Sequence, residues 1–144
     1  MIYFVLALLA GAILPFQSAI NATLRGPLGH PIWASLGSFV VGTSALVVYA
    51  VVARLPLPAT RLGDIAAWKW AGGVTGAVFV TLAVVLTPRL GPALTFALII
   101  FGQLGASLLL DHFGWLSVPQ HSVNAPRIAG VALMMVGVWL IQKF

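Results

Sequence analysis

Residues 2–24 read IYFVLALLAGAILPFQSAINATL and contain no charged side chain. A helix needs about 20 apolar residues to cross the roughly 30 Å of hydrocarbon in a bilayer, and this stretch meets that length. Its apolar part at residues 6–12 also resembles the core of a secretory signal peptide, but no basic residue precedes it. Four further apolar stretches follow, so we predict transmembrane helices over residues 2–24, 32–53, 68–87, 92–111 and 125–142.

The composition agrees with an all-α membrane protein of five transmembrane helices. Of the 144 residues, 61% are hydrophobic and 6% are charged, against about 25% charged in a typical soluble domain. The length predicts a single domain over residues 1–144. The cations are scattered singly between apolar runs, which favours contact with lipid and argues against nucleic acid. Gly26, Pro27, Gly29 and Pro31 are expected to break the chain after the first helix, and Asn124 to start the last.

The orientation of the helices in the membrane follows the Lys and Arg residues of the short loops on each side. If all five helices cross, four cations lie on the face of the N-terminus and three on the other: Arg54, Arg61, Lys69 and Arg127 against Arg25, Arg89 and Lys143. This near balance favours insertion in both orientations and an antiparallel homodimer. The alternative is that the three cations around the second loop impose one orientation.

Polar side chains inside the first helix are the first candidates for a substrate site. Gln17 and Asn21 are four residues apart, hence on one face of the helix, and Pro15 precedes them. We predict that both face the substrate, together with Phe16 and with Ser38 of the second helix. The alternative is that the amides only bond neighbouring helices, as buried polar groups in membranes often do.

The fourth predicted helix carries Gln103, Ser107 and Asp111 at intervals of four, which places them along one stripe. Gln103 and Ser107 are added to the predicted substrate-binding residues. Asp111 lies at the helix C-terminus, where a carboxylate is unfavourable without a nearby cation. We therefore predict a structural ion pair with Arg127, and keep a gate or proton acceptor as the alternative.

Enzymatic chemistry is not predicted. The sequence offers no paired carboxylates, no nucleophile with a base and no phosphate-binding glycine loop. His30, His112 and His121 lack the spacing of a metal site, and cysteine is absent. No catalytic residue, cofactor or metal is therefore expected.

Several of these residues also carry a resemblance to a known family. The first half is similar to the YdcZ family at six positions: Gly11, Gln17, Asn21, Leu24, Pro31 and Gly42. The second half resembles it at Gly91, Gln103, Ser107, the run Asp111-His112-Phe113-Gly114, Arg127 and Gly130. The resemblance implies membership of the drug/metabolite transporter (DMT) superfamily, and a five-helix module that corresponds to half of its ten-helix members.

Two classes of function follow. The first is a secondary transporter of a small solute, acting as an antiparallel dual-topology homodimer with a polar, uncharged site at the membrane midplane. The second is a non-transporting membrane scaffold or accessory subunit, whose buried amides are packing contacts. In both cases we expect a multi-pass protein of the bacterial inner (cytoplasmic) membrane, surrounded by lipid.

Overall fold

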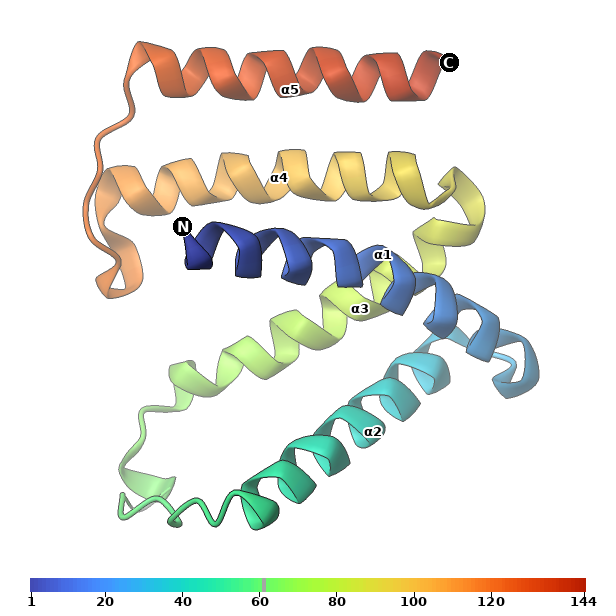
Figure 1. The fold of residues 1–144 in the computed structure, drawn as a ribbon, viewed down its shortest axis with the longest axis vertical. Coiled ribbons are helices and arrows are strands. Elements are labelled where there is room, and N and C mark those ends of the chain that lie inside the picture. The colour runs from blue at the N-terminus through green and yellow to red at the C-terminus, as the bar shows by residue number, and fades with distance from the viewer. Residues whose placement is uncertain (61) are drawn as a thin grey trace. The chain divides into compact units, whose positions relative to one another are not determined.

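The computed structural model describes residues 1–60 and 62–144, and Figure 1 shows their path. Arg61, one of the seven cations counted above, lies outside the described residues. Five long helices make up most of the chain: α1 (Ile2–Leu28), α2 (Pro31–Val52), α3 (Ala71–Leu90), α4 (Pro92–Phe113) and α5 (Ala125–Lys143). Three short 3-10 helices accompany them: η1 (Leu62–Asp64), η2 (Ala67–Trp70) and η3 (Trp115–Ser117).

The five long helices, with η2 continuing α3 toward the N-terminus, are long and apolar enough to cross a membrane. At most 17% of the most apolar stretch of each is buried inside the protein. Phe16, for example, is 72% exposed. Such surfaces are stable in lipid, because hydrocarbon tails solvate them as well as a protein core would. The prediction of an all-α membrane protein with five transmembrane helices is confirmed, and its correspondence to half of a ten-helix protein stays a prediction.

The first helix runs further than the sequence suggested. Gly26 and Pro27 lie inside α1, which ends only at Leu28. The fixed φ of proline is compatible with a helix, and its missing N–H costs one backbone hydrogen bond near the end. Gly29, another of the predicted breaking residues, ends the helix, because its φ of 75° is left-handed and its N–H reaches the carbonyls of Arg25 and Gly26.

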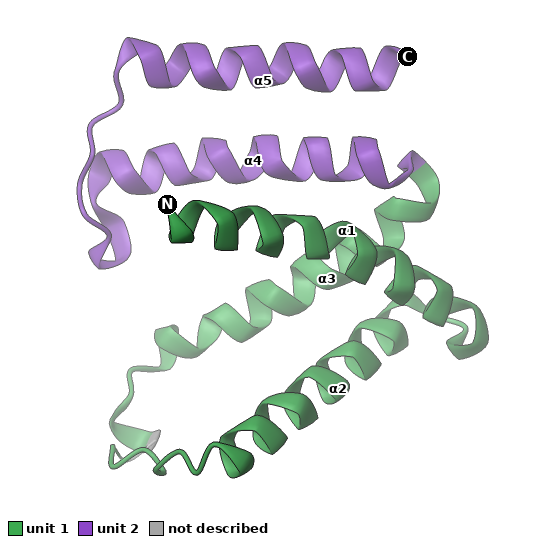
Figure 2. Ribbon diagram, viewed as in Figure 1, with its two compact units in different colours: residues 1–89 green, residues 90–144 purple. Residues whose placement is uncertain are grey.

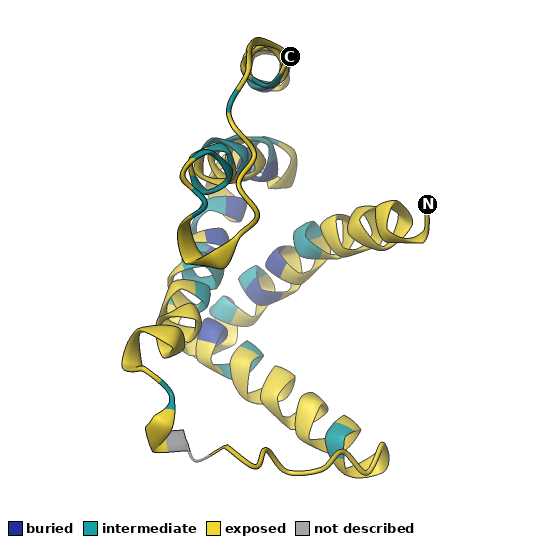
Figure 3. Cartoon of the chain, turned by 90° about the vertical axis from the view of Figure 1, so that its left-hand side faces the viewer, coloured by how far each residue is buried: buried dark blue, intermediate teal, exposed yellow. Residues whose placement is uncertain are grey.

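The chain divides into two compact units, coloured separately in Figure 2. Unit 1 comprises Met1–Arg89 and unit 2 comprises Leu90–Phe144, and the prediction of a single domain stays a prediction. In unit 1, α1 packs on α2 across a turn at Gly29 and His30. The buried residues of this unit gather where its helices approach one another, as Figure 3 shows in dark blue.

In unit 2, α4 packs on α5 across a longer connection. Asn124 is the N-cap of α5, and its side-chain oxygen accepts a hydrogen bond from the N–H of Arg127 at 3.0 Å. This cap satisfies one of the backbone donors that every helix leaves free at its N-terminus. At the other end of α5, the ammonium of Lys143 lies 4.9 Å from the ring centre of Trp139, a pairing typical of a membrane interface.

Candidate substrate site

Three side-chain hydrogen bonds connect the helices of unit 1. We call the six residues that make them the interhelical network; they pair as Ser18 with Thr87 at 2.6 Å, Asn21 with Ser38 at 3.1 Å, and Thr81 with Ser35 at 3.0 Å. These bonds join α1 to both α2 and α3, and α2 to α3. Each of the six side chains is buried or half-buried. The network thus joins the three helices to one another.

The network contains hydroxyls and an amide, and no charged group. A polar group left unpaired in an apolar surrounding costs free energy, so each of these side chains needs a partner. Neutral hydrogen bonds between membrane helices contribute about 0.6 kcal/mol on average. The network therefore supplies modest stability and pairs the polar groups where the helix faces meet.

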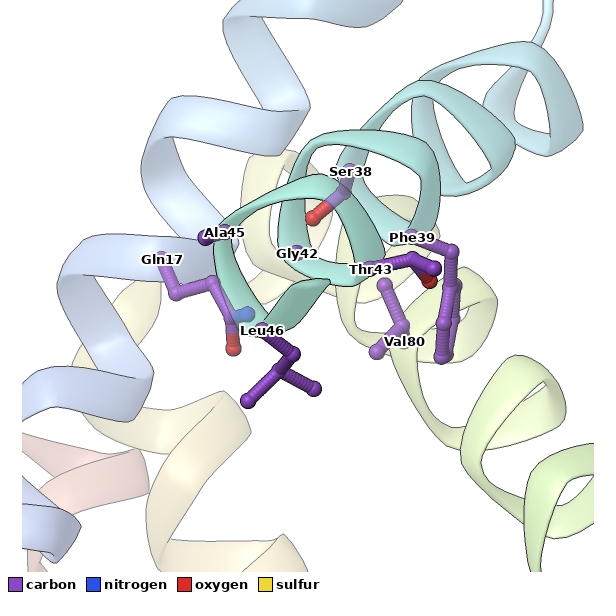
Figure 4. A pocket seen from close by; sticks show the side chains of 8 residues that line it. All are labelled: Gln17, Ser38, Phe39, Gly42, Thr43, Ala45, Leu46 and Val80. Carbon is purple, nitrogen blue, oxygen red and sulfur yellow. The ribbon is translucent and has the colours of Figure 1, made fainter. Parts of the chain in front are cut away.

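A groove of about 420 Å³ lies beside the network, between α1, α2 and α3. Figure 4 shows Gln17 extending from α1 toward α2, with Val80 contributed by α3. Eight residues line the groove: Gln17, Ser38, Phe39, Gly42, Thr43, Ala45, Leu46 and Val80. All of them lie in the middle turns of their helices. The groove therefore opens near the centre of the membrane-spanning length.

None of the residues that line this groove carries a charge. Phe39, Leu46 and Val80 supply apolar walls, and Gln17, Ser38 and Thr43 supply polar groups. The side chain of Gln17 has no hydrogen-bond partner among residues 1–60 and 62–144, whereas Asn21 uses its amide on Ser38. The two amides of α1 therefore differ, because Gln17 lines the groove whereas Asn21 is hydrogen-bonded to α2.

Three other predicted substrate-binding residues are not among those that line the groove. Phe16 is exposed on α1 and is not part of the groove lining. Gln103 and Ser107 lie on α4 in unit 2, and both side chains are exposed. Their participation in a shared site with Gln17 stays a prediction.

In unit 2, Asp111 and Arg127 form an ion pair between the end of α4 and the start of α5. The Arg127 guanidinium also donates to the His121 carbonyl at 2.9 Å, and the N–H of His121 donates to the Asp111 carbonyl at 2.8 Å. His112 accepts a hydrogen bond at Nδ1 from the Val123 N–H at 3.2 Å. The structure thus brings the two predicted partners together, and they hold the connection between α4 and α5. A gating role for Asp111 stays a prediction.

Four members of the interhelical network were not singled out from the sequence as site residues: Ser18, Ser35, Thr81 and Thr87. A spacing signal was available for two of them. Ser18 and Asn21 are three residues apart in α1, and Ser35 and Ser38 repeat that interval in α2. Residues three apart share a helix face, so two such pairs on consecutive helices indicate complementary polar faces.

Within the described part of the chain, no group of three His, Cys, Asp or Glu residues is arranged to hold a metal ion. The polar groups of the groove are an amide and two hydroxyls, which suit hydrogen bonding to an organic molecule.

Comparison with known proteins identifies the family of this chain. The model of the family described as "Putative inner membrane exporter, YdcZ" matches residues 2–140. Inner membrane protein YdcZ of Escherichia coli (strain K12) is 33% identical over 76 residues, which are 53% of this chain and 50% of that protein. The chain thus matches about half the length of this relative. No solved structure matches the chain. The description of this family names a transport class and not an enzyme class. The chain has five membrane-spanning helices and belongs to the YdcZ family of DMT-type, multi-pass inner-membrane proteins.

Proposed function

We propose that this protein is a secondary transporter of a small organic solute, and that two copies form an antiparallel, dual-topology homodimer. Together the copies would supply ten helices around one polar, uncharged site at the membrane midplane. The observation that carries the proposal is the groove at mid-depth of unit 1, in which the Gln17 amide has no partner among the described residues.

The position of the groove supports a transport role. Secondary transporters bind substrate near the bilayer midplane, at the interface between two repeats of inverted topology. Five helices give a chain whose two ends lie on opposite faces if every helix crosses. A second, inverted copy then provides the repeat that many transporters carry within one chain.

The balance of cations supports dual insertion. Four on one face against three on the other give the insertion machinery little preference. In an antiparallel pair, each copy contributes Gln17 and Ser38 at the same depth. Gln103 and Ser107 of α4 and Phe16 of α1 complete the proposed site.

One observation favours the second candidate, a scaffold or accessory subunit. The side-chain amide of Asn21 donates a hydrogen bond to Ser38, as expected of a packing contact between helices. This bond explains Asn21 but leaves Gln17 unexplained, because Gln17 has no such partner in the described residues. Transport therefore accounts for more of the polar side chains than packing does.

Orientation can be tested directly, because the chain contains no natural cysteine. A single cysteine introduced as Phe144→Cys, probed with a membrane-impermeant maleimide on spheroplasts before and after lysis, should be labelled to about half before lysis. Labelling of all or none of the protein before lysis would contradict dual topology.

A charge-biased pair of variants provides the control. Two lysines added beside Arg25 should drive the population to one orientation, because the positive-inside rule then has a clear imbalance to act on. Activity should fall, and co-expression of a copy biased the other way should restore it. Full activity of the first biased variant alone would argue for a parallel or monomeric transporter.

A further inference from the structure

The hydrogen-bonding groups of the groove indicate what it can bind. Ser38 accepts a hydrogen bond from Asn21, so its own O–H remains free to donate. No hydrogen bond joins the Gln17 amide or the Thr43 hydroxyl to another residue of the described chain, and both line the groove. The groove therefore presents donors from three side chains and an acceptor oxygen on Gln17.

Charge limits the candidates further. All groove-lining residues are uncharged, and the charged side chains among the described residues of unit 1 lie toward the ends of its helices or in the connections between them. A cation or anion would lose its hydration at mid-depth without a counter-charge, which is far more costly than burying a neutral polar group. The Phe39 ring offers a cation only a weak compensation.

The remaining surface is apolar. Phe39, Leu46 and Val80 form walls that fit the body of an organic molecule, and a groove of about 420 Å³ is within the usual range for small-molecule sites. A terminal carboxamide is itself a donor beside an acceptor, so it pairs with the Gln17 amide through two hydrogen bonds.

From these groups we infer the substrate class, which rests on the proposed transporter function. The groove binds an uncharged molecule with an apolar body and a carboxamide-like end, and Gln17 recognises that end through hydrogen bonds. Asn21 is a positioning residue, because it holds Ser38 with its hydroxyl hydrogen directed away from Asn21.

Three probes with one shared body test the inference: 3-phenylpropanamide, 3-phenylpropanoate and 3-phenylpropylammonium. Each is titrated calorimetrically against the full-length protein in lipid nanodiscs. The amide should bind at least about tenfold more tightly than either ion. Gln17→Leu should weaken amide binding by roughly tenfold, which corresponds to the loss of one or two hydrogen bonds. Gln142→Leu, which removes an amide at the end of α5 and outside the groove, should leave binding unchanged.

Gln17→Glu is a second variant, which keeps the inference testable if Gln17→Leu fails to fold. Because a carboxylate now faces the groove, the ammonium probe should become the tightest binder of the three. The inference is overturned if the ammonium ion binds the natural protein best, if Gln17→Glu leaves the order of the probes unchanged, or if no probe binds. Absence of all binding is the result expected when a lipid tail or a second copy fills the groove.

These outcomes separate the substrate class from the proposed assembly. One-sided labelling of the C-terminus would overturn the antiparallel homodimer but leave the order of the three probes standing. Tightest binding of the ammonium ion by the natural protein would overturn the substrate class but leave the dimer standing.

Discussion

The helices within unit 1 and the helices within unit 2 are held together by different kinds of contact. In unit 1 the helices are joined by neutral hydrogen bonds among hydroxyls and one amide. In unit 2 an ion pair and backbone hydrogen bonds tie the end of α4 to the start of α5. The difference follows depth in part: Ser18, Asn21, Ser38 and Thr81 of the network lie more than one turn from either end of their helices, whereas Asp111 and Arg127 lie in terminal turns.

The comparison shows how a membrane protein distributes polar groups. A charge at the bilayer centre is costly, so contacts there are made by neutral groups. At the edge, water and headgroups solvate a partly exposed ion pair; the side chains of Arg127 and Asp111 are 33% and 23% exposed. Unit 1 is thereby left with an uncharged groove, and unit 2 with a firmly held connection.

The largest effect is expected from Arg127→Met. This substitution removes the charged partner of Asp111 and the donor to the His121 carbonyl, and we expect the free energy of unfolding to fall by about 2 kcal/mol. Unfolding by titration with sodium dodecyl sulfate measures it. The matched control, Arg89→Met, removes an exposed cation and should change stability by less than about 0.5 kcal/mol. Equal losses in the two variants would show that the ion pair does not hold unit 2.

A second effect distinguishes two amides of the same helix. Asn21→Leu removes the bond to Ser38 and should lower the free energy of unfolding by about 1 to 2 kcal/mol. Gln17→Leu removes an amide with no partner among the described residues, so it should change stability by less than about 0.5 kcal/mol. Detergent unfolding of both variants checks the contrast. If Gln17→Leu were the more destabilising of the two, Gln17 would be a packing residue.

A smaller effect concerns the hydroxyl pair. A double-mutant cycle of Ser18→Ala and Thr87→Ala should give a coupling energy of about 0.6 kcal/mol, as expected for a neutral hydrogen bond between membrane helices. The cycle is measured from the unfolding free energies of the four proteins. A coupling energy of zero would mean that the two hydroxyls find equally good partners elsewhere.

The smallest effect is a response to salt. Raising sodium chloride from about 0.1 to about 1 M screens exposed charges. The free energy that protects the backbone amides of residues 114–124 from hydrogen exchange should therefore fall by about 0.5 kcal/mol or less. The peptide that carries Ser18 and Asn21 should keep its protection, because its contacts are neutral. Hydrogen exchange followed by mass spectrometry compares the two segments. Equal salt responses would remove the distinction between the units.

Much of the architecture could be predicted from local sequence. Five apolar stretches are visible without any tertiary information, because each helix must satisfy its own backbone hydrogen bonds in lipid. The pairing of Asp111 with Arg127 could also be anticipated, since a carboxylate at a helix C-terminus requires a cation. The end of α1 could be predicted only approximately: Gly26, Pro27 and Gly29 all indicate a break, and the structure decides that the left-handed Gly29 ends the helix.

The site could be predicted only in part. Gln17 and Asn21 share a helix face by their spacing, so the sequence alone determined that both lie on one polar side of α1. Only the tertiary structure decided that Asn21 bonds Ser38 while Gln17 lines a groove with Phe39. The physical reason is that helical periodicity fixes where side chains lie around one axis. Which of them meets a partner depends on how neighbouring helices cross, and that is set by packing between residues distant in the chain.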